Sequence, residues 1–524
     1  MSKQNHHGFV MPTILGILLI FVLLMGIVTT VIESNFFAVN RSSDSQKAFN
    51  IAEAGVNYYL WHLSHNPSDY KDGKTTPVAP DPQLGYGPYE HVYRDANAVE
   101  RGKYTLWINP QGGGSSVVTV RSIGEDKKSG QIRTIEAQLG APSFASYAVL
   151  SDTALWFGNT ETATGPIHSN QGVRMDGPST SDVTSANSTY VPPGSLGGDG
   201  SSKPGVWCSP SVTSPVNCAT RNKSDWRYAV PSIDFNQVTG DLCSMKKTAF
   251  SSDAATASLA NQSNACNLTP TTRTSAYLPQ RSSTGSYNLT RGYLVQLNTN
   301  GTYDLFNVNG ENDQASSYTT ALTLQSVATG VAVPASGVIF AEDNVWVRSN
   351  QTFGGRVTIG AGRLATSRKA EIVVADDLVY STKNGSDSIG LVAENSVTIA
   401  PYAPPQSGGF TFEVNAAIIA QDGYVQYPGR YRTNAYRCTR GWNGTNQNFN
   451  FYGSVAVRQG WTWTWIQGGS SCGDAVFQSG VGYVSGIQTN NTQYDNNLKY
   501  SPPPSFPTTS SFDILSWREV LTKP

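Results

Sequence analysis

The chain opens with an unbroken apolar run. From Phe9 to Ile32 there are 24 residues without a charge, and Glu33 follows. As an α-helix this run would reach about 36 Å, more than the ~30 Å hydrocarbon core of a bilayer. A signal peptide has a shorter apolar run of roughly 7–15 residues, with the cleavage site after it. The pattern therefore predicts a single membrane-spanning helix near the N-terminus.

The helical periodicity continues beyond this run. Apolar residues recur at steps of three and four along one stripe, at Ala48, Ala52, Val56, Tyr59 and Leu63. There is no proline between Pro12 and Pro67 to end or kink a helix. We expect one helix over residues 9–65, about 85 Å long. Its first half would lie in a membrane or fibre core, and its second half would lie against a globular head.

A small antiparallel sheet is expected next, within residues 66–140. Residues 66–93 are rich in proline, glycine, aspartate and tyrosine, which is typical of a connecting loop. Three strand-like runs follow at 103–108, 116–123 and 131–139, separated by glycine-rich or charged turns. A long helix packed on such a meander is the expected arrangement of this part of the chain.

From residue 147 the sequence repeats itself. Each copy has a short apolar strand, a small residue, a polar pair and a second apolar strand. Copies lie at Val149–Phe157, Ile167–Met175, Ile339–Val347, Leu391–Ile399 and Ile418–Val425, with a looser copy at Val373–Tyr380. Repeats roughly 15–35 residues apart are the signature of a solenoid. We therefore predict a right-handed parallel β-helix over residues 147–177 and 335–490, with Ala341, Ala375, Ala393 and Ala420 lining a tight corner.

Two further segments flank these repeats. Residues 178–334 are expected to form a disulfide-containing insertion, with a helix in 237–262 and strands at 292–297 and 302–306. This insertion is the region expected to carry specificity. Residues 491–524 are proline-rich and are expected to lie along the head as an extended strap, because proline fixes φ and removes a hydrogen-bond donor.

Composition narrows the class of protein. Charged residues make up 14% of the chain and the net charge is -1, which argues against nucleic acid as a partner. None of the six cysteines forms a Cys-x-x-Cys pair, and His168 is the one histidine beyond His91, so no metal site or cofactor is predicted. An even cysteine number favours disulfides in an oxidising compartment. Neighbours in sequence suggest the pairs Cys208–Cys218, Cys243–Cys266 and Cys438–Cys472, although six cysteines allow 15 pairings.

Candidate chemistry is confined to the repeat region. Its acidic residues Glu342, Asp343, Asp376, Asp377, Glu394 and Asp422 recur where each repeat turns. There a side-chain oxygen can accept from backbone N–H groups, and this structural role competes with calcium binding and with polysaccharide cleavage. His168 is expected to be structural. Trp461, Trp463 and Trp465 alternate with threonine and would face one way in a strand, either as a platform for a sugar or as a capping strand.

The N-terminus resembles the class III signal of type IV pilins and pseudopilins. It has a short polar leader with Lys3, then Gly8, then Phe9 at the start of the apolar helix. In that family a prepilin peptidase cuts after the glycine and methylates the new terminus, which would place the cut between Gly8 and Phe9. The family usually has glutamate at the fifth mature position, where this chain has Thr13. Because pilin-like proteins without that glutamate are often minor subunits at the fibre tip, the resemblance implies such a placement.

A second stretch strengthens this resemblance. Residues 48–56 include the alanine-rich sequence Ala52-Glu53-Ala54-Gly55 and look like the segment common in PilX-like minor pilins. The chain is thus expected to be a non-enzymatic minor subunit of a type IV pilus or pseudopilus. Its implied partners are prepilin peptidase, other pilins, the membrane, and a surface glycan or host ligand. It would sit in the cytoplasmic membrane with an extracytoplasmic head, and later on the cell surface or pilus.

Other interpretations stay open. The chain could be a membrane-anchored extracellular β-helix enzyme acting on polysaccharide, a pseudopilin of a type II secretion machine, or a signal-anchored protein that is never cut. Cleavage activity would require carboxylates placed irregularly, beside a basic partner in a cleft. The sequence singles out no such group.

Overall fold

The computed structural model describes residues 10–66, 69–74, 80–110, 117–159, 161–209, 217–281, 290–403, 409–427, 447–467, 476–478, 482–487, 490–509 and 512–521. The chain divides into two compact units. We call Met1–Pro110, Val118–Leu139 and Ile514–Pro524 the helix–sheet unit. We call Gln111–Val117 and Gly140–Asp513 the parallel-strand unit.

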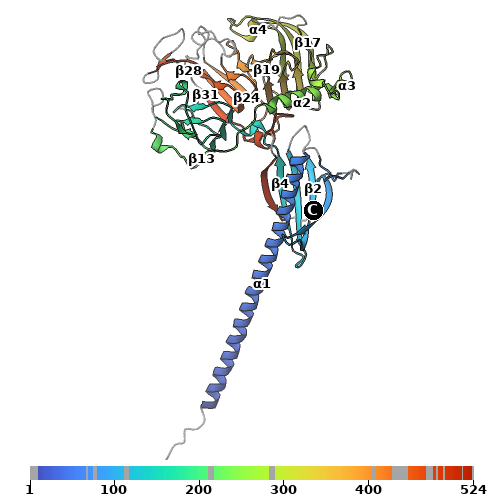
Figure 1. Ribbon diagram of the computed structural model, residues 1–524, viewed down its shortest axis with the longest axis vertical. Helices are drawn as coiled ribbons and strands as arrows, with labels where there is room; N and C mark the ends of the chain where they lie inside the picture. The colour runs from blue at the N-terminus through green and yellow to red at the C-terminus, as the bar shows by residue number, and fades with distance from the viewer. Residues whose placement is uncertain are drawn as a thin grey trace, which may run out of the picture. The chain divides into compact units, whose positions relative to one another are not determined.

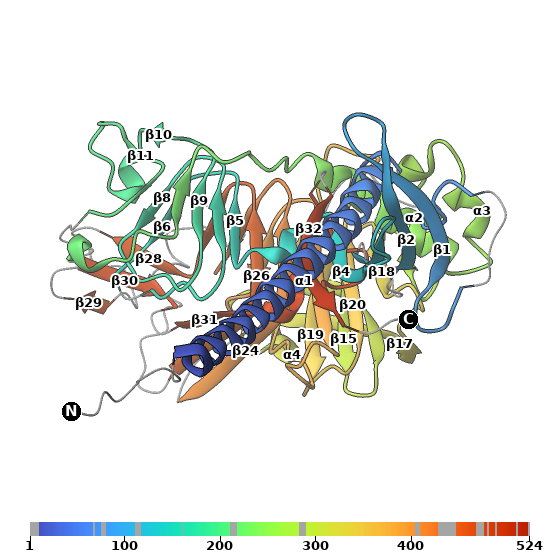
Figure 2. The same cartoon turned by 90° about the horizontal axis from the view of Figure 1, so that it is seen from below.

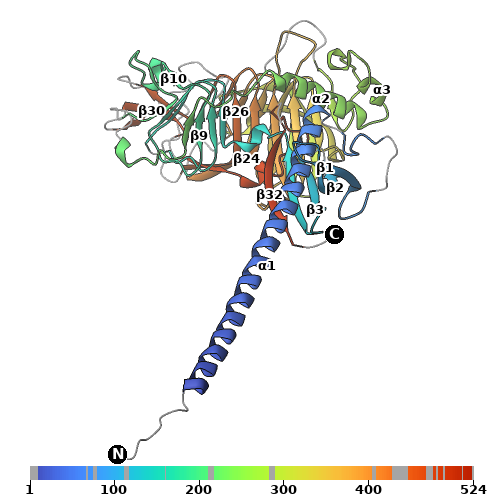
Figure 3. The ribbon, with the colours of Figure 1, turned by 60° about the horizontal axis from the view of Figure 1, so that its bottom comes forward.

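Helix α1 spans Val10–His65 and confirms the long helix predicted from the sequence. Its first half has exposed apolar side chains, such as Leu15 at 65% and Leu23 at 60%, and no strand of its unit lies beside it (Figure 3). Its second half is different. The predicted stripe is buried at every position, namely Ala48, Ala52, Val56, Tyr59 and Leu63. One helix therefore has a free apolar half and a packed half.

The packed half of α1 lies on a five-stranded sheet (Figure 1). Its order is β1-β2-β3-β4-β32, with β1 at Tyr86–Arg94, β2 at Glu100–Pro110, β3 at Val117–Asp126, β4 at Ile132–Gly140 and β32 at Asp513–Val520. Strands β1 to β3 pair antiparallel. A Cβ on Gly124 would lie 2.3 Å from the Ala48 carbonyl oxygen, so this glycine lets the helix pack directly on the backbone of β3.

Two strands of this sheet differ from the sequence prediction. Strand β1 lies largely within residues 66–93, for which the sequence predicts a loop. The Gly87-Pro88 pair is typical of a loop in sequence, but β1 is an edge strand, where proline is tolerated. Strand β32 lies within the expected C-terminal strap. It joins β4 instead, with Ser516 Oγ donating to Gln138 Oε1 at 2.9 Å and Arg518 Nη2 donating to Glu136 Oε1 at 2.6 Å.

This pairing defines how the two units are connected in the chain. Strand β4 ends at Gly140 and its neighbour β32 begins at Asp513. The parallel-strand unit occupies the chain between them. It is therefore an insertion between two adjoining strands of the helix–sheet unit.

The parallel-strand unit is built from two large sheets. The eleven-stranded sheet contains β5 Val149–Ser151, β7 Ile167–Ser169, β9 Val183–Ser185, β13 Trp226–Tyr228, β14 Tyr277–Leu278, β18 Val338–Ala341, β20 Arg356–Ala361, β22 Ser388–Ala393, β24 Phe410–Ala420, β26 Gln447–Val457 and β31 Asn490–Tyr494. The eight-stranded sheet contains β15 Gly292–Asn298, β16 Thr302–Glu311, β17 Leu322–Ala332, β19 Asn344–Asn350, β21 Ile372–Val374, β23 Val397–Ile399, β25 Tyr424–Gln426 and β27 Gly460–Thr462.

Smaller elements complete the unit. Further strands are β6 Leu155–Phe157, β8 Val173–Met175, β10 Thr189–Tyr190, β11 Lys203–Pro204, β12 Val206–Trp207, β28 Thr464–Gln467, β29 Val476–Gln478 and β30 Gly482–Gly486. The helices are α2 Gln237–Ser251, α3 Ala257–Ala260 and α4 Tyr318–Ala321, with 3₁₀ turns η1 Phe144–Ser146, η2 Gly194–Leu196, η3 Cys218–Thr220, η4 Ala265–Asn267 and η5 Asn496–Lys499.

Consecutive strands from β18 to β27 alternate between the two large sheets. Within each sheet these strands pair in parallel, as in Ile339 with Ile359 and Val345 with Ile372. The predicted corner residues Ala341, Ala375, Ala393 and Ala420 are fully buried. The repeats of the sequence therefore correspond to large parallel sheets.

The chain enters the eleven-stranded sheet in its middle. The sheet order is β13-β9-β7-β5-β26-β24-β22-β20-β18-β14, and the eleventh strand, β31, pairs with β26. The early strand β5 therefore lies beside the late strand β26 (Figure 2). Val149 pairs with Val455, about 300 positions later in the chain. From β5 the chain builds outward to β13, crosses to β14 at the other end, and returns to β26.

This order changes the expectation for residues 178–334. The sequence predicts that they stand apart from the repeats as an insertion. Strands β9, β13 and β14 from this range belong to the sheet instead. They are only two or three residues long, so they give no repeat signal in the sequence. The predicted helix and two strands of this range are present as α2, β15 and β16.

Candidate functional site

The residues of the pilin-like signal lie at the start of α1. Gly8 and Phe9 lie outside the described residues. Thr13 lies within α1 and is exposed. The helix contains an 18-residue window with mean hydropathy 2.9, none of it buried, which suffices by length and composition to cross a membrane.

Three of the predicted turn carboxylates accept hydrogen bonds from the backbone. The Asp343 carboxylate accepts from the Arg281 and Asn344 amides at 3.0 and 2.9 Å. Glu394 Oε2 accepts from the Arg363 amide at 2.6 Å, and Asp377 Oδ1 accepts from the Glu413 amide at 2.7 Å. These contacts are what a structural role at a turn requires.

Burial raises the pKa of each of these three carboxyl groups. It raises the pKa of Asp377 to about 6, although the amide hydrogen bond from Glu413 and the nearby Arg348 oppose the shift. Its neighbour Asp376 pairs with Arg348 at 3.1 Å. The two adjacent carboxylates thus have different surroundings, with one paired to a guanidinium and the other held by the backbone.

A buried ion pair involves Glu342, another of the turn carboxylates. Lys246 on α2 pairs with Glu342 after β18, and their side chains are 0% and 2% exposed. The Tyr277 hydroxyl donates to Glu342 Oε2 at 2.8 Å, and Lys246 Nζ donates to the Cys266 carbonyl oxygen at 2.9 Å. Burial lowers the pKa of Lys246 and raises that of Glu342. The sequence does not indicate this pair, because its members lie 96 positions apart.

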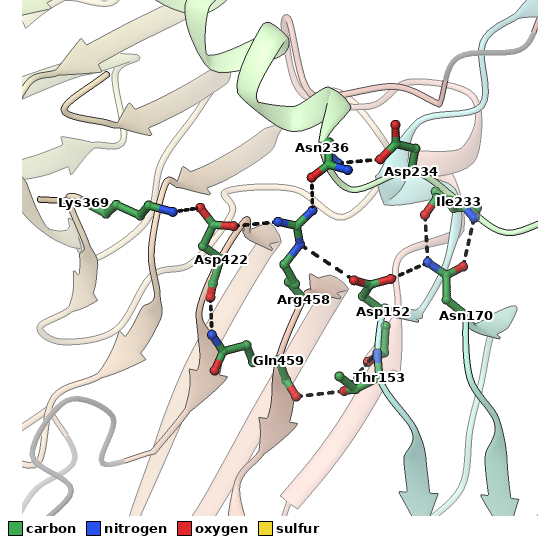
Figure 4. A network of polar contacts seen from close by, with 11 residues as sticks. Asp152, Thr153, Asn170, Ile233, Asp234, Asn236, Lys369, Asp422, Arg458 and Gln459 are labelled. Carbon is green, nitrogen blue, oxygen red and sulfur yellow. Dashed lines mark hydrogen bonds and ion pairs between the residues drawn. The ribbon is translucent and has the colours of Figure 1, made fainter. Parts of the chain in front are cut away.

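Arg458, directly after β26, joins three segments of the chain (Figure 4). Its guanidinium contacts Asp152 after β5 at 3.7 Å, Asp422 after β24 at 2.8 Å and Asn236 before α2 at 2.6 Å. Lys369 also pairs with Asp422. Asp422, the last of the turn carboxylates, therefore has two cationic partners. Through Arg458 it is part of the polar network that joins the ends of β5 and β26.

His168 has partners typical of a structural residue. Its Nδ1 lies 2.9 Å from Thr184 Oγ1 and its Nε2 lies 3.1 Å from Asn170 Oδ1. Burial lowers its pKa, and the Asn170 hydrogen bond opposes this shift. The imidazole is thus buried and hydrogen-bonded on both nitrogens.

Disulfides join Cys208 to Cys218 and Cys243 to Cys266. The second disulfide joins α2 to η4. The carbonyl oxygen of Cys266 in η4 also accepts the hydrogen bond from Lys246 Nζ. Cys438 and Cys472 lie outside the described residues, and their predicted pairing stays a prediction.

The three tryptophans do not share one strand. Trp461 lies in β27, whereas Trp463 lies between β27 and β28 and is 5% exposed. The Trp463 ring packs against Phe449 and Phe451, with centroids 5.3 and 5.9 Å away. Trp463 is therefore a core residue. The side chain of Trp465 lies outside the described ones.

Trp461 lines a small cavity that the sequence does not indicate. Its ring lies 5.7 Å from that of Phe157, and the cavity also contacts Glu161, Thr164 and Tyr494. The cavity volume is about 20 Å³. Glu161 Oε1 accepts a hydrogen bond from Asn490 Nδ2 at 3.2 Å, and burial raises the pKa of Glu161. Glu161 lies between repeats, where no periodicity marks it.

The comparisons with known proteins include a match to a solved structure. The chain is similar to the crystal structure of competence-associated pilin ComZ from Thermus thermophilus, with 12% identity over 91% of this chain and 98% of that chain. The TM-score is 0.28, so this match carries no argument. No protein-family model matches the chain, and no curated protein matches it. What the structure itself offers is a long apolar N-terminal helix, consistent with a type IV pilin, packed on an antiparallel sheet.

Proposed function

We propose that this chain is a non-enzymatic minor subunit of a type IV pilus or pseudopilus. The observation that carries the proposal is the division of α1 into a free apolar half and a half packed on the sheet. A free apolar helix needs a bilayer or other apolar helices around it. The cytoplasmic membrane would hold it first, and neighbouring pilins would surround it after prepilin peptidase had cut between Gly8 and Phe9.

The parallel-strand unit is the part that such a subunit would present. It is inserted in the chain between β4 and β32. We propose that its alternating strands wind as a right-handed parallel β-helix, and that this head binds a surface glycan or host ligand or serves pilus assembly. A tip position follows from its size, because a head of residues 140–513 on every subunit would crowd a fibre shaft.

The first experiment is N-terminal sequencing with intact mass of protein from membranes and from sheared surface filaments. We expect the filament fraction to begin at methylated Phe9. Gly8→Leu should block this processing, whereas Gly26→Leu, a control within the same apolar helix, should leave it intact. A chain that begins at Met1 and occurs only in membranes would contradict the proposal.

Placement is tested separately. Imaging with a label on the parallel-strand unit should show it at fibre ends, and Thr13→Glu should spread the label along the shaft. A label spaced along fibres of the unaltered protein would exclude the tip position while leaving the pilin assignment intact.

A further inference from the structure

Lys246 and Glu342 place an amine and a carboxyl group in direct contact inside the parallel-strand unit. Lys246 lies on α2, Glu342 follows β18, and their side chains are 0% and 2% exposed. Other lysines that pair with carboxylates, such as Lys203 and Lys383, have side chains 26% and 48% exposed. The Lys246 amine therefore meets its carboxyl group away from water.

Aromatic rings border this contact. Lys246 Nζ lies 5.8 Å from the centroid of the Phe250 ring, and the Phe250 and Tyr277 rings are 4.7 Å apart. Charges in such surroundings are costly. Burial lowers the pKa of Lys246, although Glu342 opposes this shift, and burial raises the pKa of Glu342, although Lys246 opposes that one. Proton transfer within the pair leaves a neutral amine and a carboxylic acid, and a neutral amine is the form that acts as a nucleophile.

The hydrogen bonds around the pair suit the product of such an attack. A protonated lysine has three N–H donors. Among the described residues two groups accept from them, Glu342 Oε1 and the Cys266 carbonyl oxygen, the latter at 2.9 Å. The Tyr277 hydroxyl donates to the other carboxyl oxygen, Oε2, at 2.8 Å. An amide between Lys246 Nζ and Glu342 Cδ would keep one N–H for Cys266 and one oxygen for Tyr277, so both of its polar groups have a partner in place.

We propose that Lys246 and Glu342 form an intramolecular isopeptide bond between Nζ and Cδ. The amine lone pair attacks Cδ, and an electron pair moves onto Oε2, where the Tyr277 hydroxyl stabilises it. The Cδ–Oε1 bond then breaks, and Oε1 leaves as water with the two protons that Nζ has lost. An ammonium and a carboxylate thus become an amide and water, with no oxidant or reductant. The ion pair is the state before this reaction.

The bond would hold α2 on β18 covalently, next to the Cys243–Cys266 disulfide. It would also replace two buried charges by a neutral amide whose hydrogen bonds are satisfied. This inference goes beyond the proposed function, because the bond can form whether or not the chain enters a fibre.

The test is intact-mass spectrometry and tryptic peptide mapping of the full chain, purified in detergent and reduced. We expect a mass one water molecule below that calculated from the chain's own N-terminus, and a branched peptide that contains Lys246 and Glu342. Lys246→Arg keeps a cation but removes the amine and should restore the full mass. The more exposed Lys383–Glu413 pair is the internal control, since its peptides should stay separate.

Tyr277→Phe tests the proposed geometry. It removes the hydroxyl that donates to Glu342 Oε2 and should slow the loss of water, followed by mass after synthesis is stopped, about fivefold, the effect of one hydrogen bond. Tyr303→Phe is the matched control. Its hydroxyl donates to the Ser275 carbonyl oxygen, and its removal should leave the rate unchanged.

Several results would overturn the proposal. They are a full mass with Lys246 and Glu342 in separate peptides, equal cross-linking of Lys383 to Glu413, and a rate in Tyr277→Phe no lower than in Tyr303→Phe. The first two are read from the unaltered chain, so they decide even if a variant does not fold. None of these results bears on cleavage after Gly8, so failure here is distinct from failure of the proposed function.

Discussion

The two units of this chain differ in how far apart along the sequence their contacting strands and side chains lie. In the helix–sheet unit β2 pairs with β1 and β3, its neighbours in sequence, and α1 packs on the same sheet. In the parallel-strand unit β5 pairs with β26, and Lys246 pairs with Glu342. Local patterns suffice to describe most of the first unit. The second depends on contacts that form only when the whole unit is assembled.

The largest effect should come from the buried ion pair in the parallel-strand unit. Lys246→Met leaves Glu342 buried without its cation and should lower the unit's free energy of unfolding by about 3–5 kcal/mol. Lys246→Met combined with Glu342→Gln should recover much of this loss. Denaturant unfolding of all variants measures this loss in free energy of unfolding. Lys223→Met, at an exposed lysine, is the control. A loss in the single variant no larger than in the control would show that the pair does not hold α2.

Matched core substitutions test whether the units are independent. Leu106 in β2 and Leu391 in β22 are both 0% exposed. Each leucine-to-alanine change should destabilise its own unit by about 3 kcal/mol, because it removes buried methyl groups and leaves a cavity. Calorimetry should show one transition moved and the other unchanged in each variant. A shift of both transitions by either substitution would mean that the units unfold together.

Two partly buried carboxyl groups should make the stability of the parallel-strand unit depend on pH. Burial raises the pKa of Asp241 and of Asp377 to about 6. Because these folded values exceed the ordinary value of about 4, the associated stability is fully present below pH ~4 and is lost as the pH rises through 6.

Asp241→Asn should therefore stabilise the unit by about 2 kcal/mol at pH 7 and flatten its pH profile between 4 and 7. Thermal unfolding across that range measures this, with Asp234→Asn, an exposed carboxylate in the same segment, as control. An unchanged pH profile in Asp241→Asn would show that the Asp241 carboxyl does not cause the pH dependence of stability.

An effect of similar size is expected for the closing strand of the helix–sheet unit. No residue of β32 is buried, and its contacts include the Trp517–Phe49 ring pair at 6.0 Å and the Arg133–Glu519 ion pair. Ending the chain after Asp513 should cost this unit about 2 kcal/mol. Removing only residues 522–524 is the control. A loss above about 5 kcal/mol would mean that the sheet cannot form without β32.

Several parts of the fold follow from local sequence patterns. The stripe from Ala48 to Leu63 predicts the packed face of α1, and the alanines at 341, 375, 393 and 420 mark buried corners. In the candidate site, recurrence identifies the turn carboxylates, and alternation with threonine singles out Trp461. Glu161 and Lys246 carry no such signal, because each acquires its role from a partner far away in sequence.

The sequence by itself determined where most helices and strands form, because hydrophobic periodicity and chain-breaking residues act over a few positions. It determined the free apolar half of α1 in the same way. Only the tertiary structure decided that β5 lies beside β26, that β32 closes the first sheet, and that Trp461 and Glu161 line one cavity. Many short apolar strands are compatible with one another, and the packing of the whole unit selects among them.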